Sequence, residues 1–158
     1  MIKITDQLIG EISKNARKSA RKRYNYNFHK NENDHIQRFL NALEPDTYLR
    51  PHKHESPDKV EIFLILKGRV LVIEFDNCGK IIDSIILDSD EGNNGVEIPP
   101  KAWHSLIVLE EDSVVYEIKE GPFMKEADKT FADWSPEEGT KEAYKFNKKI
   151  LSDLKIRS

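Results

Sequence analysis

The fold is decided by the stretch TYLRPHKHESPDKVEIFLILKG, residues 47–68. Two of its residues, His52 and His54, stand two positions apart, so on an extended strand both side chains point to the same face. Glu61 follows at the start of the apolar run EIFLILK, and Gly68 ends that run at a turn. The stretch therefore predicts β-structure in which strands carry two imidazoles and a carboxylate.

Several short strands are predicted around this stretch, separated by turns rich in glycine, proline and asparagine. One turn, Lys67-Gly68-Arg69, joins two apolar runs and is typical of a hairpin. Strands that recur about every ten residues are typical of a sandwich or small barrel, so we expect a mainly β fold rather than a parallel α/β sheet. The predicted strands are residues 60–66, 70–75, 80–87, 96–98, 105–109 and 114–119.

Helices are predicted on both sides of the strands. Thr5 can cap a first helix, and the apolar stripe within residues 34–43 predicts a second. Between them, aromatic residues alternate with polar ones in RYNYNFH, residues 23–29, which predicts a short strand. Ser135-Pro136 predicts the start of a C-terminal helix with an apolar face over residues 142–156. Whether this helix covers the barrel, pairs with another subunit or is loosely held is left open.

Length and composition limit the function classes. A chain of 158 residues favours one structural domain. Its net charge of −3 argues against a nucleic-acid partner, and no stretch approaches the roughly 20 apolar residues that a membrane span needs. Cys78 stands alone, and the charged N-terminal residues do not resemble a signal peptide, so we expect a cytoplasmic protein without an intramolecular disulfide. The expected parts are a helical lead-in at 1–45, a β-barrel at 46–121 and a C-terminal extension at 122–158.

His104 is a third candidate imidazole ligand, placed just after a turn that contains Pro99-Pro100. Three neutral imidazoles and one carboxylate suit a divalent first-row metal ion. Glu61 shares its strand face with Phe63 and Ile65, where a buried carboxylate is costly without a partner such as a metal ion. An isolated His-x-His pair, by contrast, is more often a surface or core feature than a metal site. The full pattern predicts one divalent ion (Zn, Fe, Mn or Ni) bound by His52, His54, Glu61 and His104.

The spacing of these residues resembles the two motifs of the cupin superfamily, G(X)5HXH(X)3–4E(X)6G and G(X)5PXG(X)2H(X)3N. The first motif is matched by His52, His54, Glu61 and Gly68, and the second largely by Gly95, Pro99 and His104. Six residues rather than three or four separate His54 from Glu61, and Lys101 and Val108 replace the usual Gly and Asn. The resemblance implies a cupin-type antiparallel β-barrel (jelly roll), to which the N-terminal helices and the C-terminal helix are added. The wider gap leaves open whether Glu61 binds the metal directly or stands behind a three-histidine site.

A longer part of the chain, from about residue 8 to residue 123, is similar to the WbuC-type cupin-fold metalloproteins. The similarity is carried by ARKSARKRYNYNFHKNENDHIQRFLNAL (residues 16–43), by residues 47–68 and by YEIKEGPF (residues 116–123). It includes a helical lead-in that generic cupins lack. Proteins of this type occur in bacterial gene clusters for O-antigen and related surface polysaccharides. The resemblance therefore implies a metal-binding β-barrel associated with sugar metabolism, and it brings no settled reaction.

Three residues near the predicted metal site are candidates for contact with a substrate. Arg50 shares a strand face with the histidines and can clamp a carboxylate or phosphate, or can form a salt bridge at the barrel rim. Tyr48 lies on the same face and can donate a proton to a sugar, or can be an aromatic lid on the core. Glu117 and Tyr116 lie on opposite faces of one predicted strand, so one of them should face inward. Glu117 is a candidate catalytic base.

Asn25, Asn27 and His29 lie on one face of the strand predicted within residues 23–29. Such a polar, non-ionic trio can hydrogen-bond sugar hydroxyls, or it can be the solvated face of an edge strand. The preferred function is a metal-dependent isomerase or epimerase that acts on a sugar or nucleotide-sugar. The alternatives are an Fe(II)-dependent oxygenase and a non-catalytic sugar-binding module. Strand edges at the barrel leave room for a homodimer.

Overall fold

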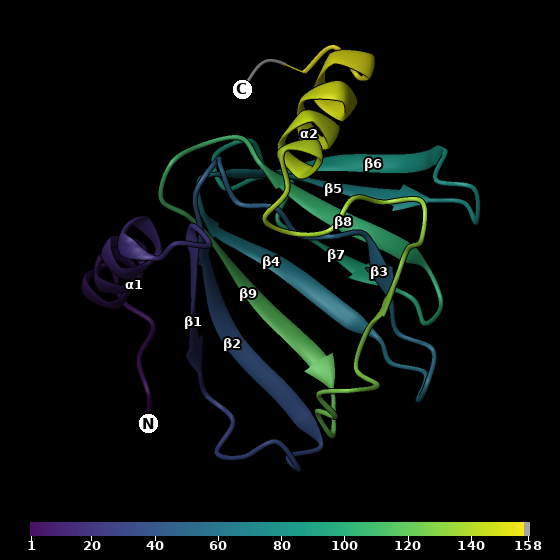
Figure 1. Cartoon of the computed structure of the whole chain (residues 1–158). Coiled ribbons are helices and arrows are strands. Elements are labelled where there is room, and N and C mark those ends of the chain that lie inside the picture. The colour runs from purple at the N-terminus through teal and green to yellow at the C-terminus, as the bar shows by residue number, and fades with distance from the viewer. Residues whose placement is uncertain (157–158) are drawn as a thin grey trace.

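Two antiparallel β-sheets of five strands each face one another in the computed structural model, which describes residues 1–156 (Figure 1). The architecture confirms the expected antiparallel β-barrel of the jelly-roll type. The last two residues of the expected C-terminal extension, 157–158, lie outside the described residues. The first sheet contains, in spatial order, β1 (Arg23–Asn27), β2 (Ile36–Leu43), β9 (Ser113–Glu120), β4 (Glu61–Lys67) and β7 (Gly95–Ile98). The second contains β10 (Thr130–Phe131), β3 (His52–Lys53), β8 (Trp103–Val108), β5 (Arg69–Phe75) and β6 (Ile81–Asp88).

The six strands predicted from residue 60 onward are all present, as β4 to β9. The hairpin predicted at Gly68 is wrong, because β4 belongs to the first sheet and β5 to the second. Gly68 instead carries the chain across from one sheet to the other. Its φ is +74°, and a Cβ at this position would clash with Ser113, so only glycine fits this corner.

Apolar side chains fill the space between the sheets, and others cover the outer faces. Strand β5 shows the division most clearly, because both of its faces are buried. Val70 and Val72 face the core between the sheets, whereas Leu71 and Ile73 belong to a separate cluster on the outside of the second sheet. The outer face of this sheet is therefore apolar and requires a cover.

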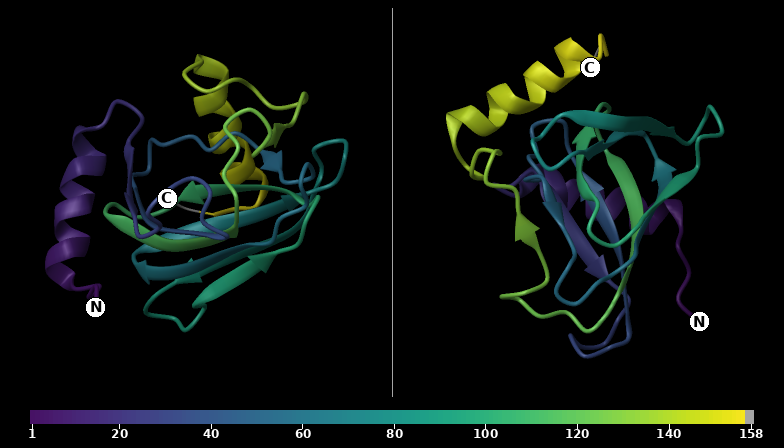
Figure 2. Two further views of the ribbon diagram at one scale, coloured as in Figure 1. Left: turned by 90° about the horizontal axis from the view of Figure 1, so that it is seen from below. Right: turned by 90° about the vertical axis from the view of Figure 1, so that its right-hand side faces the viewer.

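Helix α2 (Lys141–Asp153) provides that cover for the second sheet (Figures 1 and 2). Phe146 and Ile150 of this helix pack in one cluster with Leu71 and Ile73 of β5. Of the three arrangements that the sequence left open for the C-terminal helix, the structure shows the one in which it covers the barrel.

The start predicted for this helix at Ser135-Pro136 is wrong. Ser135 is buried, and its hydroxyl donates a hydrogen bond to the carbonyl of Ala132 at 2.8 Å. The helix is capped by Thr140 instead, whose hydroxyl oxygen accepts a hydrogen bond from the Ala143 N–H at 3.2 Å. A Ser-Pro pair fits the loop that leads to this helix equally well, which is why the pattern misplaced the boundary.

Helix α1 (Asp6–Lys18) covers the outer face of the first sheet in the same way (Figure 2). Thr5 caps it as predicted, since its side chain accepts a hydrogen bond from the Leu8 N–H at 3.3 Å. Ile12 is fully buried and packs with Leu40 of β2. Within the described residues, neither helix has the length and apolar character needed to span a membrane.

The second helix predicted over residues 34–43 is wrong, because the chain there forms β2, which pairs with β9 along its whole length. Both faces of β2 are buried. Leu40 and Ala42 pack on the side of α1, whereas Phe39 and Asn41 face an interior pocket. A strand covered on both faces has a nearly continuous apolar run, and such a run can imitate helical spacing. The short strand predicted before it is confirmed as β1.

Candidate metal centre

The four residues predicted as metal ligands come together between the two sheets. His52 of β3 pairs directly with His104 of β8, His54 follows β3, and Glu61 begins β4 of the opposite sheet. Each offers one ligand atom, and these atoms all lie within 4.8 Å of one another. All four residues are buried, with no more than 3% of their surface exposed. The wider gap between His54 and Glu61 therefore does not remove Glu61 from the cluster.

Each imidazole is oriented by a hydrogen bond between its Nδ1 and a backbone carbonyl. The three pairs are His52 with Arg50 at 3.0 Å, His104 with Ala102 at 2.9 Å, and His54 with Asp128. A carbonyl oxygen can only accept, so each Nδ1 carries the ring proton. The Nε2 atom of each neutral ring then has a free lone pair, which is the arrangement found in metal-binding histidines.

The inward-facing atoms of this cluster lack hydrogen-bond donors. His104 Nε2 lies 2.9 Å from Glu61 Oε2, and because the ring proton is already used at Nδ1, this contact needs a second proton or a cation. Among the described residues, His52 Nε2 and Glu61 Oε1 have no hydrogen-bond partner, and the nearest carboxylate oxygen to His54 Nε2 is Glu61 Oε2 at 3.5 Å. Buried acceptors that face one another without a donor are costly, and a cation resolves the conflict. The four residues therefore fit one divalent metal ion.

Protonation states in the cluster suit metal binding. Burial lowers the pKa of His52 well below its ordinary value, and the nearby Lys129 ammonium lowers it further. Burial alone would raise the pKa of Glu61, but its close contacts with the His104 and His54 rings and the positive charge of Lys119 together hold that pKa well below the ordinary range. At neutral pH, His52 is neutral and Glu61 is an anion, which are the forms that bind metal.

A second carboxylate, Glu117, lies beside Glu61 in the same pocket. It stands on β9 opposite Phe63 of β4 and accepts a hydrogen bond from Asn41 Nδ2 at 3.2 Å. Burial raises the pKa of Glu117 well above its ordinary value, and the negative charge of Glu61 raises it further. Of the two neighbours that the sequence left open, Glu117 faces inward, whereas Tyr116 packs on the side of α1.

A buried ion cluster behind His54 was not predicted from the sequence. Asp128 accepts hydrogen bonds from Lys59 Nζ at 2.7 Å and from Lys119 Nζ at 2.5 Å, and all three residues are at most 4% exposed. The backbone carbonyl of Asp128 also holds the His54 ring, so the cluster positions a metal ligand. Lys119 could have been found from its place on the same strand face as Glu117. The other two lie in irregular segments, where no periodic signal exists.

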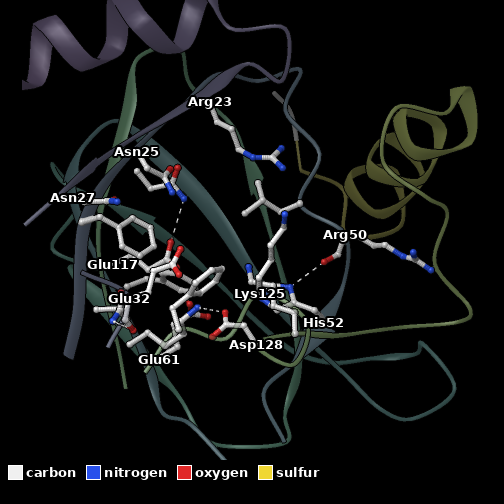
Figure 3. Close-up of a pocket in the computed structure, with 18 of the residues that line it drawn as sticks. Arg23, Asn25, Asn27, Glu32, Arg50, His52, Glu61, Glu117, Lys125 and Asp128 are labelled. Carbon is white, nitrogen blue, oxygen red and sulfur yellow. Dashed lines mark hydrogen bonds and ion pairs between the residues drawn. The ribbon is translucent and has the colours of Figure 1, made fainter. Parts of the chain in front are cut away.

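The metal cluster adjoins a pocket of about 460 Å³, and two of its members form part of the pocket wall (Figure 3). Asn25, Asn27 and His29 line another side of the pocket from the β1 region, as the period-two pattern predicts. Both amide side chains are exposed and open to contact with a ligand. His29 Nδ1 lies 3.1 Å from both the N–H and the carbonyl oxygen of Arg38, so the backbone of β2 holds this ring in place.

Tyr48 and Arg50 are not brought to the metal cluster. The Tyr48 hydroxyl donates to the carbonyl of Pro136 at 2.9 Å, and Tyr48 is not among the described residues that line the pocket. Arg50 borders the pocket, but its Nε donates to Ser135 Oγ at 3.2 Å, and Figure 3 shows its side chain directed away from the metal cluster. In this arrangement, both side chains hold the segment before α2 against the barrel.

The buried Tyr48 hydroxyl gives a testable pH dependence. Burial raises the pKa of Tyr48 to about 12, so the folded protein keeps the phenol proton longer than the unfolded chain does. The stability that this group contributes is complete below about pH 10 and is lost as the pH rises from about 10 through 12. When the pH is raised from about 9.5 to about 11.5, the free energy of unfolding of the wild type should therefore fall by about 2 kcal/mol more than that of Y48F. Denaturant unfolding at the two pH values measures the difference.

Tyr24 supplies the matched control, because it is exposed. The Y24F variant removes the same hydroxyl from the surface and should follow the wild-type pH dependence. If the free energy of unfolding fell equally for Y48F and for the wild type over this pH range, Tyr48 would titrate alike in the folded and unfolded chains.

Comparison with known proteins agrees with this geometry. The facing antiparallel sheets and the buried histidine–carboxylate cluster define a cupin-type fold with a candidate metal centre. KdgF from Halomonas sp. is similar with a TM-score of 0.51 and 15% identity, over 66% of this chain and 83% of KdgF. CapF from Staphylococcus aureus, a capsular polysaccharide assembling protein, is similar with a TM-score of 0.55 and 21% identity, over 66% of this chain and 28% of CapF. At these identities the likeness shows the fold alone.

The family of the chain follows from its sequence. The chain belongs to the family described as a domain of unknown function, DUF6016, which matches residues 4–87, just over half of its length. The match begins just before α1 and ends within β6, so it includes three of the four metal-ligand candidates, His52, His54 and Glu61. No curated protein matches the sequence significantly.

Proposed function

We propose that this protein is a metal-dependent enzyme that isomerises or epimerises a sugar or nucleotide-sugar. The observation that carries the proposal is a metal-ligand set at the wall of a pocket, with a second carboxylate, Glu117, beside it in the same pocket. Such reactions need one group that polarises a carbonyl or hydroxyl and another that moves a proton. The pocket offers both within the reach of a single ligand.

The residues divide these roles between them. A divalent ion held by His52, His54, Glu61 and His104 would supply the Lewis acid that polarises a substrate oxygen. Glu117 takes a proton from the carbon next to the polarised group and returns it to the substrate. The hydrogen bond from Asn41 at 3.2 Å fixes the direction of the Glu117 carboxyl group.

The opposite part of the pocket suits a polyhydroxylated ligand. Asn25 and Asn27 present amide groups that can each donate to one hydroxyl and accept from another. A volume of about 460 Å³ lies within the range of small-molecule sites, roughly 300–1,000 Å³. The pocket therefore accommodates a sugar with one end at the metal cluster and hydroxyls at the amides.

The setting proposed for this activity is the metabolism of surface polysaccharides. Support comes from the resemblance to the WbuC-type metalloproteins, which extends from about residue 8 to residue 123. The likeness in fold to CapF, a capsular polysaccharide assembling protein, agrees with such a setting.

Proton exchange in D2O tests the proposed reaction directly. Protein loaded separately with Zn²⁺, Mn²⁺, Fe²⁺ or Ni²⁺ is incubated with monosaccharides and nucleotide-sugars, and NMR detects deuterium at the reacting carbon. We expect exchange with at least one metal. E117Q should keep the metal and lose most of the exchange, whereas E97Q, which alters an exposed carboxylate on β7, should behave as the wild type.

Two results would replace this proposal by the alternatives. Sugar binding without exchange for any metal would indicate a binding module. Oxygen consumption that occurs only in the iron-loaded protein would indicate an oxygenase. Exchange that is unchanged in E117Q would keep the reaction class and remove Glu117 from it.

A further inference from the structure

We propose that the pocket selects sugars that carry an anionic group, a carboxylate or a phosphate, and that Lys125 and Lys129 hold this group. The inference rests on the proposed sugar function and adds the chemical class of the substrate. Both lysines line the pocket and come from the irregular segment between β9 and β10. They are thus carried by a different part of the chain from the amides of β1.

Five other charged residues of the pocket wall are already paired with one another. The pairs are Lys119 with Asp128, and Arg21 and Arg23 with Glu138. Glu61 belongs to the metal cluster, and the ion itself would add two positive charges. The two remaining acids of the wall, Glu32 and Glu117, form no ion pair with either lysine. Among the described residues, no carboxylate lies within 4.0 Å of the Lys125 or Lys129 ammonium.

Lys129 lies close to the chemistry of the site. Its side chain is half-buried, and its charge acts on both His52 and Glu117, lowering the pKa of each. Lys129 lines the same pocket as His52, and a divalent ion bound there would repel its ammonium group. A carboxylate or phosphate on the ligand would place a negative group between them and would form charge-assisted hydrogen bonds with the lysine.

Arg50, which the sequence suggested as an anion clamp, is otherwise engaged. Its guanidinium binds Ser135 and the carbonyl of Ala132, so it has fewer donors left for a ligand. Lys125 and Lys129 have no such partners within the described chain and retain their ammonium protons for an anion.

The amide groups of β1 and the two lysines lie at different places in the pocket. Figure 3 shows Asn25 and Asn27 on one side, and Lys125 with His52 on another. A sugar that bridges these places would have hydroxyls at the amides and its acidic group at the lysines. A neutral sugar would fill the same volume and leave the lysines uncompensated.

Binding measurements on the metal-loaded full chain test this inference. Isothermal titration calorimetry is carried out with D-glucuronate, D-glucose 6-phosphate, D-glucose and inorganic phosphate. We expect at least one anionic sugar to bind about tenfold or more tightly than glucose, the factor that charge-assisted hydrogen bonds typically supply. The stronger of the two anionic sugars identifies the group as a carboxylate or a phosphate.

The double variant K125A/K129A should lose this advantage while elemental analysis shows unchanged metal content. K141A/K145A is the matched control, because it removes the same charge from two exposed positions on α2 and should keep wild-type affinities. Circular dichroism confirms that both variants are folded.

The outcomes distinguish failure of the anion site from failure of the sugar function. Equal affinity for glucose and both anionic sugars, or unchanged affinities in K125A/K129A, would overturn the anion site and leave the sugar function intact. Binding of inorganic phosphate that depends on the two lysines, without binding of any sugar, would support the anion site and contradict the sugar function. No binding of any probe would overturn both.

Discussion

The H52A variant is expected to retain almost no metal after purification and dialysis. Its imidazole is one of four groups whose ligand atoms lie within 4.8 Å of one another, and its Nε2 has no partner among the described residues. Loss of a residue that only supports a metal ligand typically weakens metal affinity by about 10–100-fold, so loss of a ligand itself should weaken it by about 100-fold or more. Elemental analysis measures the metal content directly.

Thermal unfolding gives a second reading of the same change. A metal that binds only the folded chain stabilises it in proportion to the logarithm of its concentration. Added metal should therefore raise the Tm of the wild type and leave that of H52A unchanged. H104A should behave as H52A does. The control is H35A, which removes an exposed histidine outside the cluster and should keep both the metal and the shift in Tm. Normal metal content in H52A and H104A would place the ligands elsewhere.

The metal cluster could be predicted because its geometry is largely local. His52 and His54 share a strand face by the period-two rule, and Glu61 opens an apolar strand where an unpaired carboxylate is costly. The direct pairing of His52 with His104 is different, since it depends on the register of β3 and β8. His104 was predicted as a ligand from its place after the Pro99-Pro100 turn, and the resemblance to the cupin motifs agreed with this, but neither gave the pairing with His52.

Two of the errors in the predicted elements involve strands that are buried on both faces. Residues 36–43 form β2 between α1 and the pocket, so their apolar run lacks the alternation that marks a strand. Gly68 likewise joins two apolar strands that lie in different sheets, and a local turn signal does not distinguish a corner from a hairpin. Periodicity reports which faces are buried, and it does not report which strands pair.

The partners of the metal cluster escaped prediction for another reason. Lys59 lies in the wide gap between His54 and Glu61, and Asp128 lies in the loop between β9 and β10. Nothing in the local sequence indicates that these two residues, 69 positions apart, form one buried ion pair. Contacts of this kind arise from the closed fold rather than from neighbouring residues.

The D128A variant is expected to lower the free energy of unfolding by about 3–5 kcal/mol. Asp128 is the shared counter-ion of Lys59 and Lys119, and its loss removes the ion-pair partner of two buried ammonium groups. Typical domains are stable by only about 5–15 kcal/mol, so this change is a large part of the total. Urea unfolding followed by circular dichroism measures it. D128N keeps the size and one acceptor oxygen but removes the charge, and it should be destabilised less severely.

The D153A variant is the matched control for the buried charge. Asp153 pairs with Lys149 at 2.6 Å on the surface of α2, where the two side chains are 54% and 76% exposed, and this pair should contribute about 0.5 kcal/mol or less. The Asp128 carboxylate anchors the loop whose backbone carbonyl holds His54. Weaker anchoring in folded D128N should displace that carbonyl and weaken metal binding by about 10-fold or more, whereas D153A should bind metal normally. Equal destabilisation by D128A and D153A would mean that the two buried lysines do not depend on Asp128. Normal metal affinity in D128N would mean that the ion cluster stabilises the fold without positioning the metal ligand.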